Sequence, residues 1–115
     1  MKIRSLLKDV QFVGRAAGLS QNYETFESDR ASLLFSPGDR ADFFVNVVDK
    51  RAPERIARSC AGREVTSGTV ARSVRRLPFG DSPLAALYVM TAIGRAKKLR
   101  KMQGRSLVFK IVGPR

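Results

Sequence analysis

Apolar residues recur at intervals of three and four positions in the first segment of the chain. They are Ile3, Leu6, Leu7, Val10 and Val13. Because this spacing places them on one face of a helix, it predicts an amphipathic helix over residues 1–13, ended by Gly14 or Gly18. The segment is also basic and nearly free of acid, which is typical of mitochondrial presequences. Two interpretations therefore stay open for residues 1–18: a helix that packs on the core, and a targeting signal.

Residues 20–30 are polar and acidic, a pattern typical of a loop or an edge strand. Two aromatic residues, Tyr23 and Phe26, lie within this stretch. Aromatic side chains stack on the bases of single-stranded nucleic acids. More often such side chains fill the edge of a protein core, and this is the position that we expect for both residues.

A β-hairpin is predicted in the next part of the chain. The β-rich segments Arg30–Phe35 and Arg40–Asp49 flank a Ser-Pro-Gly-Asp sequence. Pro37 fixes φ at the first central position of a turn and Gly38 accepts a positive φ at the second, so a type II turn fits. The run Phe43–Val48 is almost continuously apolar, and we expect this strand to be covered on both faces.

Two short helices are predicted after the hairpin. Pro53 suits the first position of a helix over Pro53–Ala61, and Gly62 is suited to end it. A second helix is predicted over residues 68–77, with Ser67 as its cap. The alternation of valine and arginine in this second segment also permits a strand. Its apolar residues at helical spacing are Val70, Val74 and Leu77.

A long helix is predicted over residues 82–103. The Asp-Ser-Pro sequence at its start provides a cap and a proline suited to the first helical position, and Gly104 follows its end. The first half is apolar on every side, so we expect it to be buried. The second half is basic, and cations there interact favourably with the helix dipole. In Ser106–Val112, apolar residues at every second position would share one face of a strand, so this segment predicts a final strand.

The fold class that we expect from these elements is α+β. We expect a small single domain over residues 1–115 in which a mostly antiparallel sheet of roughly three or four strands is packed by helices. A long basic helix is expected near the C-terminus.

The positive charge is concentrated in the second half of the chain. The 115 residues include 22 Lys plus Arg against 10 Asp plus Glu, a net charge of +12. Residues 1–60 hold 10 basic and 8 acidic side chains, whereas residues 61–115 hold 12 basic and 2 acidic ones. Arg outnumbers Lys by 15 to 7, and arginine both binds phosphate through two hydrogen bonds and stacks on bases. This pattern indicates a nucleic-acid binder; an acidic protein partner and a membrane surface are the alternatives.

Two basic clusters are the candidate nucleic-acid sites. Like charges at helical spacing repel one another by roughly 0.2–0.5 kcal/mol per pair, so a cluster of them indicates a compensating anion, for which phosphate fits best. The members of the first cluster are Arg95, Lys97, Lys98, Arg100, Lys101 and Arg105. The second cluster consists of Arg72, Arg75 and Arg76, which converge on one side whether their segment is a helix or a strand.

Residues 56–58 and 67–77 together resemble the two helices of a helix-turn-helix DNA-binding motif. Their sequences are Ile-Ala-Arg and Ser-Gly-Thr-Val-Ala-Arg-Ser-Val-Arg-Arg-Leu. The second helix of such motifs enters the major groove with its N-terminal residues. The resemblance therefore implies that DNA is contacted by Ser67, Gly68, Thr69 and Arg72.

Several other chemistries find little support in the sequence. No uninterrupted apolar stretch reaches the ~18 residues of a membrane span. A single cysteine cannot form an internal disulfide, and without any histidine to act as its base Cys60 is expected to be a small buried residue. Asp39 and Asp42 flank the hairpin turn and are expected to serve it. We expect no enzymatic activity, no cofactor and no metal site.

The sequence thus predicts a non-catalytic RNA-binding component of a large ribonucleoprotein. The ribosome is the expected particle, and the presequence-like start favours a mitochondrial one. The expected partners are rRNA, bound through its backbone by the Arg and Lys clusters, and neighbouring proteins of the particle. We expect an intracellular location, the mitochondrial matrix being one option. Two alternatives remain: a helix-turn-helix regulator that binds DNA, and a basic accessory subunit that docks on an acidic protein.

Overall fold

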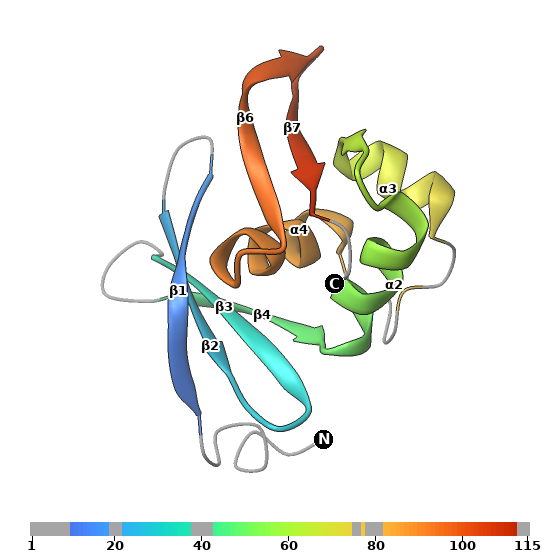
Figure 1. Ribbon diagram of the computed structural model, residues 1–115. Coiled ribbons are helices and arrows are strands. Elements are labelled where there is room, and N and C mark those ends of the chain that lie inside the picture. The colour runs from blue at the N-terminus through green and yellow to red at the C-terminus, as the bar shows by residue number, and fades with distance from the viewer. Residues whose placement is uncertain (1–9, 19–21, 38–42, 75–76, 78–81, 113–115) are drawn as a thin grey trace.

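Seven strands and three helices form in the part of the chain that the computed structural model describes, which comprises residues 10–18, 22–37, 43–74, 77 and 82–112 (Figure 1). One antiparallel sheet consists of β1 (Gln11–Ala17), β2 (Asn22–Glu27), β3 (Ala31–Pro37) and β4 (Phe43–Asp49), in that order. A second has the order β5 (Glu64–Val65), β7 (Ser106–Ile111) and β6 (Ala96–Gln103). The helices are α2 (Arg51–Cys60), α3 (Ser67–Ser73) and α4 (Pro83–Ala92). The expected α+β class is confirmed.

The predicted central hairpin is the pair of strands β3 and β4. Ala31 lies opposite Asp49, and Pro37 lies opposite Phe43. The two predicted strands are therefore confirmed, but the turn is not the one expected. A tight turn would need Ser36 to lie at its first position, whereas Ser36 is paired with Phe44 because the ladder continues through the proline. The connection thus falls at residues 38–42, outside the described residues.

Two predictions about the N-terminal part of the chain are wrong. Residues 11–13 belong to β1 rather than to an amphipathic helix, and residues 1–9 lie outside the described residues. Phe12 pairs with Phe26 across β1 and β2, and pairing of this kind outweighs a short helical spacing. The polar segment after residue 20 forms β2, which is not an edge strand because β1 and β3 flank it.

The helix α4 lies at the centre of the molecule, between the two sheets (Figure 1). Its residues Ala85–Met90 are all buried, as expected for a segment that is apolar on every side. Tyr88 stacks on Tyr23 of β2, with ring centroids 4.8 Å apart, and meets Phe109 of β7 edge-on at 6.0 Å. Tyr23 therefore fills the edge of the core, as expected, and α4 joins the two sheets into one core.

A glycine allows β1 to approach α4. A Cβ atom on Gly14 would lie 2.6 Å from the backbone carbonyl oxygen of Ala92 at the end of α4. We expect Gly14→Ala to lower the free energy of unfolding by about 2 kcal/mol, because both backbones must move apart. Chemical denaturation measures this. Gly68→Ala is the matched control, since its Cβ would meet only side-chain atoms, at 3.5 Å and 3.7 Å, and alanine has the higher helix propensity. Equal losses in both variants would contradict the prediction.

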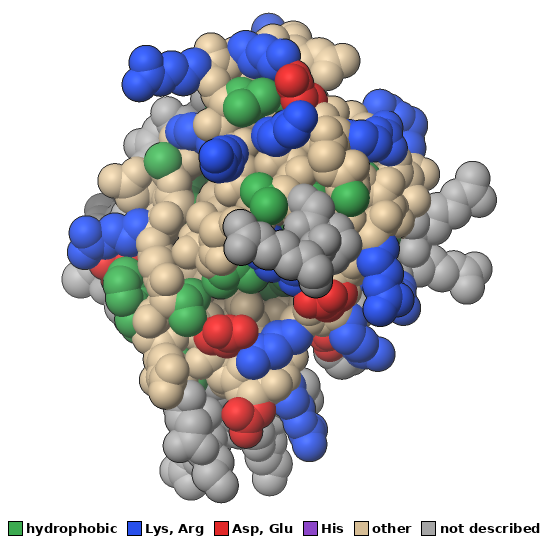
Figure 2. Space-filling model, in the orientation of Figure 1, with side chains coloured by type: hydrophobic (Ala, Val, Ile, Leu, Met, Phe, Trp, Pro, Cys, Tyr) green, Lys and Arg blue, Asp and Glu red, His purple; other side chains and the backbone are tan. Residues whose placement is uncertain are grey.

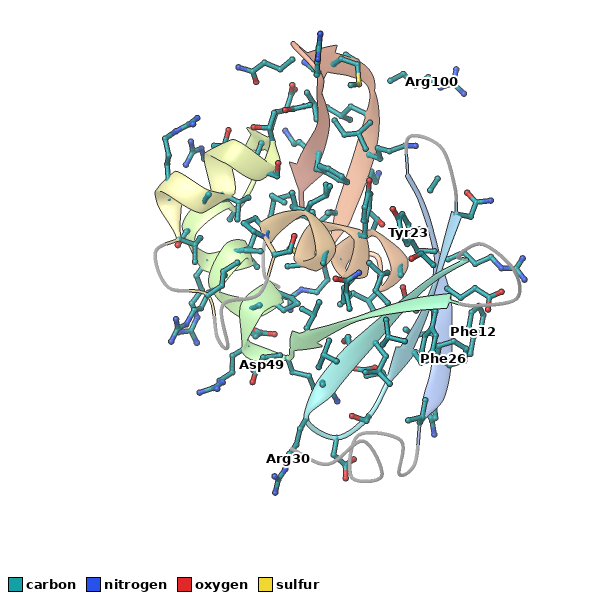
Figure 3. All side chains as sticks on the ribbon, turned by 180° about the vertical axis from the view of Figure 1, so that it is seen from behind. Phe12, Tyr23, Phe26, Arg30, Asp49 and Arg100 are labelled. Atoms are coloured by element: carbon teal, nitrogen blue, oxygen red, sulfur yellow. The ribbon has the colours of Figure 1, made fainter. Side chains whose placement is uncertain are left out.

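The first turn of α2 is set by Asp49 rather than by a proline. The backbone N–H of Arg51 donates to Asp49 Oδ1 (2.8 Å), and the side-chain hydrogen bond from the same arginine holds the pKa of that carboxyl below its usual range. Figure 3 shows Asp49 where β4 meets α2. The helix consequently begins two residues before Pro53, and Gly62, with φ of 73°, follows its end as predicted.

The outer face of the first sheet is apolar and partly exposed. Val45 and Val47 of β4 are 46% and 41% exposed, so the expectation that this strand is covered on both faces is wrong for them. The reason is that β4 is an edge strand whose neighbour α4 covers only the inner face, which carries Val48. Phe26 lies on the outer face against Phe12, with ring centroids 5.5 Å apart, instead of at the core edge (Figure 3). The side chains of residues 43 and 44 lie outside the described part.

The helix α3 confirms the predicted helix for residues 68–73 and begins one residue before them, but the predicted end at residue 77 is wrong because Val74 is extended, with φ of −118° and ψ of 92°. Its cap is Thr66 and not Ser67: the Thr66 hydroxyl accepts from the Thr69 N–H (3.2 Å), and the Thr69 hydroxyl accepts from the Thr66 N–H (3.4 Å). Cys60, at the end of α2, is fully buried, and this burial raises the pKa of its thiol. The expectation of a small buried residue at this position is confirmed.

One buried hydroxyl in the first sheet has no hydrogen-bond partner among the described residues. It belongs to Thr25, which is fully buried on the inner face opposite Leu34. We expect Thr25→Val, which keeps the shape of the side chain, to raise the free energy of unfolding by about 1 kcal/mol, because it removes an unsatisfied group. Urea denaturation checks this. Thr66→Val should have the opposite sign, with a loss of about 1 kcal/mol, because it removes a helix cap. A less stable Thr25→Val variant would contradict the assignment.

Candidate nucleic-acid interface

The long basic C-terminal helix is not present, because α4 ends at Ala92. Gly94 adopts a left-handed φ of 78° just after the helix. The N–H of Arg95 donates to the carbonyl of Met90 (2.8 Å), and the N–H of Gly94 donates to that of Thr91 (3.3 Å). This pair of bonds is the helix-ending motif that a left-handed glycine favours. The predicted start is confirmed, since the Ser82 hydroxyl accepts from the Ala85 N–H (3.4 Å).

The first basic cluster therefore lies mainly on a β-hairpin formed by β6 and β7. The strands are paired from Ala96 opposite Ile111 to Gln103 opposite Ser106, and Gly104 begins the two-residue turn with φ of 62°. The strand β5 pairs only with the C-terminal end of β7. The rest of the hairpin is two strands wide, and it extends beyond α4 at the top of Figure 1.

Cationic side chains are dense along this hairpin and its approach. Residues 95–110 contain seven basic and no acidic side chains. Figure 2 shows Lys and Arg side chains gathered over the β6–β7 hairpin at the top and over α2 and α3 on the right. Arg95 is half-buried at the base of the hairpin. The exposed cations on the hairpin are Lys97, Lys98, Arg100, Lys101, Arg105 and Lys110.

The strand register places these cations on both faces of the hairpin. Lys97 lies opposite Lys110, which in turn lies opposite Glu64 of β5. Lys98 lies opposite Phe109, which faces the core. Because directly paired residues share a face and successive residues alternate, Lys97 and Lys98 point to opposite sides. A register shift between Lys98 and Met102 interrupts the alternation, and Figure 3 shows Arg100 projecting from the β6 edge, away from β7.

Two of the predicted site residues form ion pairs within the protein. Arg95 Nη1 lies 2.6 Å from Glu54 Oε1, which ties the base of the hairpin to α2. Lys101 pairs with Glu64, and its hydrogen bond lowers the pKa of that carboxyl. The remaining cations of the hairpin form no ion pair with any acidic side chain in the described ranges. These five unpaired cations are Lys97, Lys98, Arg100, Arg105 and Lys110.

The structure describes only one member of the second cluster. Arg72 is exposed on α3, whereas Arg75 and Arg76 lie outside the described residues, as do Asp39 and Asp42. The resemblance to a helix-turn-helix motif does not extend to the connection between its helices. Residues 61–66 contain β5, which pairs with β7, in place of a tight turn.

Lys110 is a further candidate site residue that the sequence analysis did not include. In the sequence this lysine alternates with the apolar residues of β7, which indicates that it lies on the exposed side of the strand. This pattern is the sequence signal from which it could have been identified. Its position opposite Lys97 depends on the pairing of β6 with β7, which a helix over residues 82–103 does not allow. The hairpin thus brings together cations that are thirteen residues apart in the sequence.

Comparison with known proteins does not assign this chain to a family. No group of metal-ligating side chains is found among the described residues, and none of the described helices is long and apolar enough to cross a membrane. No protein-family model matches the chain, and no curated protein or solved structure is similar to it.

Proposed function

We propose that this protein is a non-catalytic RNA-binding component of a large ribonucleoprotein, and that the β6–β7 hairpin binds the RNA backbone. The observation that carries the proposal is the group of five exposed cations that form no ion pair with an acidic side chain in the described structure, although Lys110 lies opposite Glu64 in the strand pairing. Like charges directly opposite each other on paired strands, such as Lys97 and Lys110, repel each other, and phosphate groups relieve that repulsion. The ribosome is the particle in which we expect the protein.

The fold supports RNA over DNA as the partner. The strand β5 takes the place of the turn on which a helix-turn-helix reader depends. A basic hairpin on a small packed core instead suits binding to backbone and shape, which dominates recognition of folded RNA. The mitochondrial ribosome is part of the proposal because the start of the chain is basic and poor in acid. Residues 11–17, which belong to the candidate targeting segment 1–18, are paired in the first sheet.

The salt dependence of RNA binding tests the electrostatic basis of this proposal. Each neutralised phosphate of single-stranded RNA contributes about −0.7 to the slope of log affinity against log salt, so five contacts give a slope of about −3.5. Fluorescence anisotropy with labelled poly(U) between low and physiological salt measures the slope. A slope near zero would reject the interface.

Sedimentation of the native protein tests the particle. We expect the protein to move with a heavy particle in a density gradient and to be released by RNase. A small species that DNA shifts and RNA does not would favour the DNA regulator. A heavy complex from which no RNA can be extracted would favour docking on an acidic protein.

A further inference from the structure

We propose that the β6–β7 hairpin is an arm that inserts between two backbone segments of a folded RNA, so that both of its faces bind phosphates. This inference rests on the proposed function and adds the kind of RNA that the hairpin fits. It follows from how the cations are distributed over the hairpin, and not merely from their number.

Cations lie on both faces of the hairpin, at its free edge and in its turn. On the outer face the three lysines Lys97, Lys101 and Lys110 accompany Glu64, which leaves a net charge of +2. Lys98 lies on the inner face, Arg100 projects from the free edge of β6 and Arg105 lies in the turn, with no acidic side chain on the hairpin itself. A surface that lies flat on a nucleic acid needs cations on one side only. Exposed cations on both faces indicate phosphates on both sides.

The tip of the hairpin has the shape of an inserting element. The two-residue turn at Gly104 and Arg105 adds no bulk, so the tip is only two strands wide, about 5 Å between strand axes. Met102, on the same face as Leu107, is 45% exposed next to the turn. An exposed apolar side chain contributes little to a flat electrostatic contact, but it can pack against a base or a ribose inside a folded RNA.

The inference also identifies the type of RNA. The major groove of a continuous A-form helix is too narrow for protein side chains to enter, and its minor groove is shallow. Neither groove surrounds a two-stranded ribbon on both faces. The expected ligand is therefore a helical junction, where two RNA backbones diverge and leave a space with phosphates on both sides.

Paired substitutions on the two faces test the proposal in the full-length protein. One variant carries Lys97→Gln and Lys110→Gln, and the other carries Lys98→Gln and Arg100→Gln. The probes are a three-way RNA junction and a continuous RNA duplex with the same number of base pairs. With the junction, each variant should bind about 60-fold more weakly at about 0.1 M salt, with a salt slope reduced by about 1.8, because each loses two contacts to phosphates of double-helical arms.

The matched control carries Arg15→Gln and Arg30→Gln, which remove one charge from β1 and one from the connection between β2 and β3. Figure 3 shows Arg30 at the opposite end of the molecule from Arg100, and both control residues are exposed. The control should leave affinity for the junction within about threefold of the unmodified protein, and circular dichroism should show that all variants fold. Wild-type protein should bind the junction with a steeper salt slope than the duplex.

The outcomes separate the arm from the proposed function. If only one face pair affects junction binding, or if the junction and the duplex give the same slope, the hairpin lies flat and the arm is rejected while RNA binding stands. If neither face pair has more effect than the control, both the arm and the hairpin interface are rejected. Equal losses for the two face pairs, confined to the junction, support the arm.

Discussion

Neutralising all five unpaired cations of the hairpin is expected to weaken RNA binding about 3,000-fold at about 0.1 M salt, because each lost phosphate contact costs about fivefold under these conditions. The variant carries glutamine at the five positions 97, 98, 100, 105 and 110. All five side chains are exposed and form no ion pair with described acids, so their loss should not reduce stability. Anisotropy titrations with poly(U) at several salt concentrations measure both the affinity and the slope.

The control for this variant removes five charges from the other half of the chain. Glutamine replaces Lys2, Arg4, Arg15, Arg30 and Lys50, which leaves both variants with the same net charge. If binding depended on net charge alone, the two variants would weaken equally. A control variant that retains most of its affinity would assign binding to the hairpin, and equal losses would contradict that assignment.

The same titration can show which of the two basic clusters contributes more to the affinity for RNA. Glutamine at Arg72, Arg75 and Arg76 should have a smaller effect than the hairpin variant if the hairpin is the main contact. A change of sequence preference on DNA after Arg72→Gln would instead support the helix-turn-helix alternative, because a base contact carries sequence information and a phosphate contact does not.

The largest loss of stability is expected from Phe109→Ala, which should lower the free energy of unfolding by about 3–5 kcal/mol. Phe109 is fully buried on β7, contacts Tyr88 of α4 and lies opposite both Lys98 and Val65. Its removal leaves a cavity where the second sheet meets the central helix. Thermal and urea denaturation followed by circular dichroism measure the change.

Phe12→Ala is the matched control for that substitution. Phe12 is 54% exposed on the outer face of the first sheet. The same chemical change there should cost only about 1–2 kcal/mol, because more than half of this side chain is already in water and its contact with Phe26 is the main loss. Losses of similar size in the two variants would mean that Phe109 is not a central core residue. The hairpin cations are unchanged in the Phe109→Ala variant. We therefore expect this variant to bind RNA at temperatures low enough for it to be folded.

Elements whose signals are local could be predicted from the sequence. The β3–β4 hairpin, the body of α2, the buried first half of the last helix and the strand β7 each follow from a hydrophobic pattern or a capping residue within their own segment. The start of α4 is of this kind, because Ser82 and Pro83 act within one helical turn. Such signals do not depend on the rest of the chain.

Elements that depend on distant partners were not predictable in the same way. Residues 11–13 have helical spacing, yet they form a strand because β2 offers a pairing partner and α4 a surface for Gly14 to approach. Residues 96–103 have the composition of a basic helix end. They form β6 because Gly94 ends α4 and β7 supplies a partner for the strand. Helix propensity is worth only tenths of a kcal/mol per residue, which such pairing exceeds.

The sequence by itself determined the fold class, the excess of arginine and the concentration of positive charge in the second half of the chain. It also identified six of the cations in and beside the hairpin, from Arg95 to Arg105. Only the tertiary structure decided which of them are neutralised by Glu54 and Glu64, that Lys110 joins them, and that they occupy both faces of a ribbon. Charge is a property of residues and is read directly, whereas the face on which a charge lies depends on strand register, which long-range pairing sets.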